Sequence, residues 1–172
     1  LNGFGGRLFN EVRSRQGLAY SVYASWSPGY DFDGMFIAGG QTQTSNTVPF
    51  VKSVISEIEK LRTSLVTEQE LDDAKESILN SFVFNFQTPS QTLSRLMRYE
   101  YFDYPEDFIF TYQKQVQDTN REDILKAAQK HIKPKQLVTL VVGNKQAMNP
   151  SLDSLNQEIT MLDISIDSSG QS

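Results

Sequence analysis

Residues 48–132 form a series of helical apolar patterns separated by strong stop signals, and this arrangement most constrains the possible folds. Within each part, apolar side chains recur three and four positions apart, which is the spacing of one helix face. The stop signals are Pro89, Pro105 and Pro134, and proline disrupts a helix interior because it lacks the backbone N–H. We therefore predict successive helices over residues 48–65, 67–86, 90–102, 107–117 and 119–132.

Two of these helices begin with the sequence of a capping box. In such a box a Thr side chain accepts from the backbone N–H three residues on, and a Glu at that position accepts from the N–H of the Thr. Thr67 with Glu70, and Thr119 with Glu122, have this spacing. We therefore expect helices to start at these two threonines.

Strand-like patterns lie on both sides of the helical part. The apolar alternation of residues 18–26 and 35–44, around the turn sequence SPGYDFDG, predicts an antiparallel hairpin. A glycine-rich entry and a short helix precede the hairpin. The β-branched run at 136–143 (QLVTLVVG) and residues 161–166 follow the helices as candidate strands. This order predicts an α+β fold, in which several helices cover one face of an antiparallel or mixed β-sheet.

The length of 172 residues fits a single domain. We expect this domain to cover residues 1–166. The small, polar residues 167–172 are expected to form a disordered tail.

The composition excludes several kinds of site within this chain. It has no Cys and a single His, His131, which rules out thiolate catalysis, a disulfide and a His-rich metal site. The H-x-x-E-H motif of zinc peptidases is absent. A net charge of −5 without a Lys/Arg run argues against nucleic acid as a partner, and the apolar stretches are far shorter than the ~20 residues of a membrane span. We expect a soluble chain, and its compartment stays open between the cytoplasm and a periplasm or organelle.

Two polar residues flank the tight turn expected at Gly17. Arg7, Glu11 and Arg15 lie four residues apart and can form a ladder of ion pairs, whereas Arg13 has no acidic neighbour at helical spacing. Tyr20 stands at the head of a strand whose same-face neighbours are apolar. The residues alone leave both readings open: a solvated arginine and a core tyrosine, or two groups that hold a ligand.

The string R-L-F-x-E-V-R-x-x-x-G-L-A-Y-S-V at residues 7–22 resembles the C-terminal-domain signature of the insulinase/pitrilysin-type zinc peptidases. This family also contains the mitochondrial processing peptidases. The glycine-rich segment at residues 1–6, the helical middle, the 136–143 strand and the ending L-D-I-S-I also fit. The resemblance spans residues 1–166 and is most specific over residues 7–22.

The resemblance implies a function for the chain. Members pair two homologous domains or chains around a closed chamber, and the first of the two carries H-x-x-E-H, binds zinc and activates water. The second holds the substrate, and Arg13 and Tyr20 match its Arg and Tyr. The chain would then be the substrate-binding, chamber-closing half of a zinc endopeptidase, without catalytic or metal-binding residues of its own and inactive alone. Zinc is expected in the partner domain.

The same resemblance implies partners and a structural expectation. The partners would be the H-x-x-E-H-bearing domain or subunit, an extended peptide, and, as one possibility, a second copy of the chain. A family domain has strands before the glycine-rich segment, so the chain is expected to be a partial domain lacking them. Two alternatives stay open: a non-peptidase scaffold of the same fold, as in respiratory-complex core subunits, and an unrelated interaction domain.

Overall fold

The computed structural model describes residues 4–163 of the chain. The predicted tail at 167–172 and residues 164–166 of the last predicted strand lie outside this range. The helices and strands are α1 (Phe4–Leu8), a π-helix (Phe9–Arg15), β1 (Ser21–Ser27), β2 (Met35–Gln41), α2 (Thr47–Thr63), α3 (Glu68–Phe82), α4 (Pro89–Tyr101), α5 (Phe108–Asp118) and α6 (Arg121–His131).

The predicted hairpin is confirmed. β1 and β2 pair antiparallel, from Ser21 opposite Gln41 to Ser27 opposite Met35, without an interruption of the register. Gly40 is needed here because a Cβ on it would lie 2.1 Å from the Ser21 carbonyl oxygen and 3.0 Å from the Phe50 ring. The hairpin therefore approaches α2 more closely than any side chain at residue 40 would allow.

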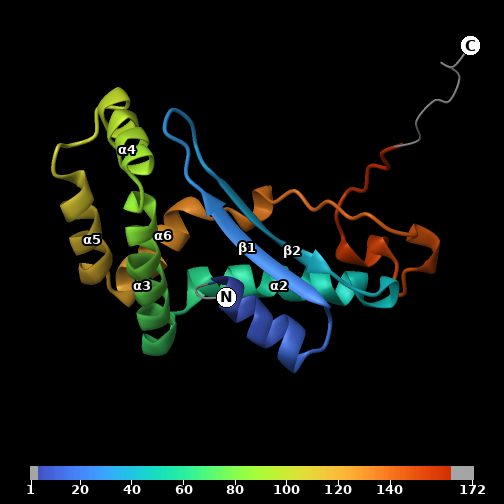
Figure 1. Ribbon diagram of the computed structural model, residues 1–172. Coiled ribbons are helices and arrows are strands. Elements are labelled where there is room, and N and C mark those ends of the chain that lie inside the picture. Colours follow the sequence, from blue (N-terminus) through green and yellow to red (C-terminus); the bar gives the residue numbers. More distant parts are fainter. Residues whose placement is uncertain (1–3, 164–172) are drawn as a thin grey trace, which may run out of the picture.

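The main core lies between the hairpin and the helices beneath it. Figure 1 shows the hairpin crossing over α2, with the N-terminal helical segment beside it. The buried apolar side chains of this core are Leu8, Val12, Val22, Phe50, Val54, Ile58, Ala128 and Ile132. Helices thus cover one face of an antiparallel sheet, and the α+β prediction is confirmed.

A second group of helices packs through aromatic rings. The ring of Phe82 in α3 lies 5.3 Å from that of Tyr112 in α5, and Tyr99 in α4 lies 5.0 Å from Phe108 in α5. Tyr30, in the loop of the hairpin, stacks on Phe102 at 4.4 Å. This contact joins the tip of the hairpin to the end of α4 (Figure 1).

The strand predicted at 136–143 is wrong. Within residues 4–163 the sheet has two strands, and the chain after α6 continues without a strand partner. Three of its apolar side chains are largely exposed: Val138 at 93%, Leu140 at 75% and Val142 at 83%. A β-branched run becomes a strand only when a neighbouring backbone pairs with it, and none of the described residues does so. Met161–Asp163, the described part of the last predicted strand, is likewise not a strand.

Of the two predicted capping boxes, one is present in the structure. The box of Thr67 and Glu70 at the start of α3 is confirmed. The box predicted at Thr119 and Glu122 is wrong, because α6 is capped one residue later by Asn120 and Asp123. A third box, Thr88 with Gln91, starts α4, so that Pro89 is the first residue of that helix.

Among residues 4–163, the helices all fall short of the length and apolar character that a membrane crossing requires.

Candidate functional site

Arg13 lies on the exposed side of the π-helix. Its guanidinium stands over the ring of Phe9, 4.7 Å from the ring centre. The predicted ladder is only partly present, because Arg15 pairs with Glu11 at 2.9 Å whereas Arg7 pairs with Glu70 instead. No carboxylate within residues 4–163 forms an ion pair with Arg13. Its charge is therefore available to an external group.

The π-helix ends in a tight turn at Gly17. This residue has a φ of +63°, in the left-handed region that glycine adopts without strain. Its N–H donates to the Arg13 carbonyl at 3.1 Å, and the N–H of Leu18 donates to the Val12 carbonyl at 3.0 Å. The turn thus fixes the backbone at Arg13 and sends the chain directly into β1.

Tyr20 is at the surface rather than in the core. Its side chain is 63% exposed, and its N–H donates to the Gln41 carbonyl at 2.8 Å, which continues the hairpin by one residue. The phenol oxygen accepts a hydrogen bond of 2.9 Å from the side-chain amide of Gln43. Tyr20 therefore presents an accessible hydroxyl at the end of a rigid hairpin.

Side-chain hydrogen bonds tie the turn to its surroundings. The Thr42 hydroxyl donates to the Leu18 carbonyl at 2.5 Å. The Ser53 hydroxyl, on α2, donates to the side-chain carbonyl of Gln16 at 2.9 Å. Arg13 and Tyr20 thus stand exposed on either side of an anchored turn, and no hydrogen bond joins the two among the described residues.

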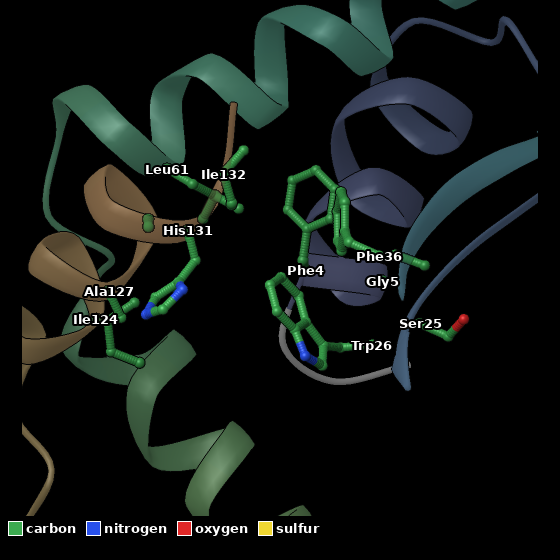
Figure 2. Close-up of a pocket in the computed structure, with 12 residues that line it drawn as sticks. Phe4, Gly5, Ser25, Trp26, Phe36, Leu61, Ile124, Ala127, His131 and Ile132 are labelled. Atoms are coloured by element: carbon green, nitrogen blue, oxygen red, sulfur yellow. The ribbon is translucent and has the colours of Figure 1, made fainter. Parts of the chain in front are cut away.

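A separate apolar cavity of about 440 Å³ lies between α1, the hairpin, α2 and α6 (Figure 2). The ring centre of Phe36 lies 5.7 Å from the ring centres of both Phe4 and Trp26, and these three rings form one wall. His131, at the end of α6, faces the cavity from the other side. Tyr20 does not line this cavity, and the nearest lining residue on β1, Ala24, is four residues further along the chain, which is about 13 Å in an extended strand.

The residues of this chain do not fit a zinc site. A catalytic zinc site takes three protein ligands, usually His with a carboxylate, and this chain has one His. Within residues 4–163, no three His, Cys, Asp or Glu side chains gather where they could hold a metal ion.

Comparisons with known proteins agree with the signature. Residues 1–78 match the family described as the peptidase M16 inactive domain. The chain is 33% identical over 147 residues to the "Non-peptidase homolog YmxG" of Helicobacter pylori (strain ATCC 700392 / 26695), an alignment that covers 84% of this chain and 33% of that protein. It is 30% identical over 89 residues to the "Uncharacterized zinc protease YmxG" of Bacillus subtilis (strain 168), covering 52% of this chain and 22% of that protein. The chain therefore spans a third or less of the length of these relatives.

Two solved structures share the fold. The crystal structure of a peptidase M16 inactive domain from Pseudomonas fluorescens has a TM-score of 0.67 and 27% identity, over 77% of this chain and 31% of that one. The crystal structure of a protease from Helicobacter pylori has a TM-score of 0.60 and 23% identity, over 76% of this chain and 31% of that one, and shows the fold alone. The matched residues and the shared fold together show that this chain is similar to the inactive domain of the peptidase M16 family.

Proposed function

We propose that this chain is the substrate-binding half of a two-part zinc endopeptidase and closes the chamber in which an extended peptide is held. The zinc and the H-x-x-E-H motif belong to a partner domain or subunit, and this chain is inactive alone. The observation that carries the proposal is the pair of exposed donors, Arg13 and Tyr20, at one anchored turn.

Each of the two residues has a definite role in the proposal. The Arg13 guanidinium, free of an ion pair among the described residues, donates to a carbonyl of the peptide backbone. The Tyr20 hydroxyl donates to the carbonyl of the bond to be cleaved, and more strongly to the oxyanion that develops on it. A donor aimed at developing charge lowers the barrier by about 3 kcal/mol.

The test is hydrolysis of a quenched fluorescent peptide by this chain mixed with its H-x-x-E-H-bearing partner. We expect Tyr20→Phe to lower kcat by about 100-fold, because it removes one oxyanion donor. Arg13→Ala should mainly raise KM, because it removes a contact that the bound substrate already makes. Arg15→Ala and Tyr23→Phe are matched controls, since Arg15 is an exposed neighbour on the same π-helix and Tyr23 is 52% exposed on β1. Unchanged kinetics in both site variants would contradict the proposal.

A second candidate is a non-peptidase scaffold of the same fold. It is favoured by the name of the Helicobacter pylori relative, "Non-peptidase homolog YmxG". A scaffold would bind the partner half without supporting hydrolysis, and both site variants would leave that binding unchanged. Assembly measured alongside hydrolysis therefore separates the two candidates. Assembly of the chain with a second copy of itself would be detected in the same experiment.

A further inference from the structure

The hydrogen bond between Gln43 and Tyr20 fixes more than the position of the phenol ring. The side-chain nitrogen of Gln43 donates to the Tyr20 oxygen over 2.9 Å. A phenol oxygen carries one proton and can accept through its lone pairs, whereas an amide nitrogen only donates. Because Gln43 occupies a lone pair, the proton of Tyr20 points away from Gln43 and toward solvent.

The backbones that carry both side chains are anchored. The N–H of Tyr20 donates to the Gln41 carbonyl at 2.8 Å, and the Thr42 hydroxyl donates to the Leu18 carbonyl at 2.5 Å. Gln43 itself caps the short 3₁₀ turn Thr44–Asn46, since its carbonyl accepts from the Asn46 N–H at 2.9 Å. Both side chains therefore project from fixed points, and their contact does not depend on a mobile loop.

We infer that Gln43 is a positioning residue that holds the Tyr20 hydroxyl as a hydrogen-bond donor toward the peptide carbonyl. The inference rests on the function proposed above, in which Tyr20 meets substrate. Gln43 itself donates a hydrogen bond to the phenol oxygen and does not contact the peptide in this proposal. A free hydroxyl rotates and can turn its proton toward any nearby acceptor. A hydroxyl that already accepts from Gln43 is preorganised for donation, which is the property that oxyanion stabilisation requires.

The first test uses the chain alone. In a ¹H–¹⁵N spectrum, the side-chain amide resonances of Gln43 should shift in Tyr20→Phe, because the phenol oxygen that accepts from them is lost. Tyr23→Phe, which removes another exposed phenol of the same hairpin, should leave them in place. An unshifted Gln43 resonance in Tyr20→Phe would overturn the inference.

The second test uses the complex of the chain with its H-x-x-E-H-bearing partner and the same peptide. Gln43→Glu keeps the size of the side chain but replaces the donor by a carboxylate, so the Tyr20 proton turns toward it. We expect kcat to fall by about 10-fold or more with KM nearly unchanged. Gln41→Glu places the same charge on another exposed glutamine of this strand end and should change kcat less than twofold.

The decisive comparison repeats Gln43→Glu in the Tyr20→Phe background. A residue that acts only through the Tyr20 hydroxyl has no further effect there, so the two changes should be strongly non-additive. If Gln43→Glu lowers kcat by the same factor in the wild type and in Tyr20→Phe, or lowers it in neither, Gln43 does not position Tyr20. This inference then fails, while the proposed function stands. If Tyr20→Phe itself leaves kcat unchanged, the proposed function fails, and this inference fails with it.

Discussion

At the scale of single residues, Glu70 joins two parts of the fold. One carboxylate oxygen accepts from the Arg7 Nε, and the other accepts from the Arg7 Nη2, both at 2.8 Å. The second oxygen also accepts from the N–H of Thr67 at 2.8 Å, which closes the capping box of α3. The hydrogen bonds from Arg7, followed by those from Thr67, lower the pKa of Glu70 from 4.5 to about 2, against the opposing effect of burial.

The low pKa of Glu70 predicts how stability depends on pH. A carboxyl group whose pKa is lower in the folded state stabilises the fold above its unfolded pKa and loses that contribution as the pH falls. The contribution of Glu70 should therefore be complete above about pH 5 and disappear between pH 4.5 and about 2. Between pH 6 and pH 3, we expect the free energy of unfolding to fall by about 1–2 kcal/mol less in Glu70→Gln than in the wild type. This value is reduced for solvent screening, because the Glu70 side chain is 31% exposed.

This difference is measured by urea unfolding of both proteins at a series of pH values. Glu68→Gln is the matched control, because Glu68 pairs with Arg121 from a 72% exposed position where screening is strong. Parallel pH profiles for the wild type and Glu70→Gln would contradict the assignment.

At the scale of elements, the start of α6 shows what a capping box contributes. Asn120 has the extended backbone of an N-cap, and its side-chain oxygen accepts from the Asp123 N–H at 2.9 Å. The Asp123 carboxylate accepts from the Asn120 N–H at 3.1 Å in return. The sequence pattern one residue earlier, Thr119 with Glu122, satisfies the same rule but is not used.

We expect Asn120→Ala to lower the free energy of unfolding by about 1 kcal/mol, because it leaves helix N–H groups without an acceptor. Glu122→Ala removes the residue that the sequence pattern favours and should cost less than about 0.5 kcal/mol, since only a charge near the helix N-terminus is lost. The two losses in the free energy of unfolding are compared by measuring the denaturant midpoints of Asn120→Ala and Glu122→Ala. An equal or larger loss for Glu122→Ala would place the cap at Thr119 after all.

These elements also show how much the sequence can predict. The helices follow from local periodicity and stop signals, and their existence and order are correct. The cap of α6 is not determined locally, because two overlapping boxes satisfy the same rule. The run at 136–143 has the composition of a strand, but a strand requires a partner, which a local pattern cannot supply.

The candidate site divides in the same way. Arg13 and Tyr20 are proposed as site residues from the signature that surrounds them. Gln43 is not, because its contact with Tyr20 depends on the hairpin register across a seven-residue loop at positions 28–34, for which no short-turn rule fixes the pairing. The register in the structure brings the two residues to the same end of the hairpin.

At the scale of the whole molecule, the segment after α6 differs from the two paired strands in its backbone hydrogen bonds. Residues 138–142 belong to no helix or strand, and within the described part of the chain their backbone N–H groups make no backbone hydrogen bond. Their outward side chains are apolar and exposed. Such a segment presents unpaired backbone groups together with apolar surface, which is the condition for adding a strand.

We expect the amide hydrogens of residues 138–142 to exchange at the rate of an unstructured peptide when the chain is alone, while those that pair β1 with β2 are protected. Hydrogen–deuterium exchange followed by mass spectrometry measures both in one experiment. The hairpin is the internal control. Protection of residues 138–142 equal to that of the hairpin would show that a backbone already pairs with them in solution.

The π-helix before Gly17 has a consequence for insertions and deletions in the gene. A helix with i→i+5 bonds accommodates one residue more than the α-helical turn it replaces. Loss of a single codon within residues 10–12 would restore the ordinary ladder, and the residues on either side would keep nearly the same relative position. Arg13 would then lie three residues after Phe9 in an α-helix, a spacing that still places both side chains on one helix face. The contact between Arg13 and the Phe9 ring therefore tolerates the loss of one residue from this segment.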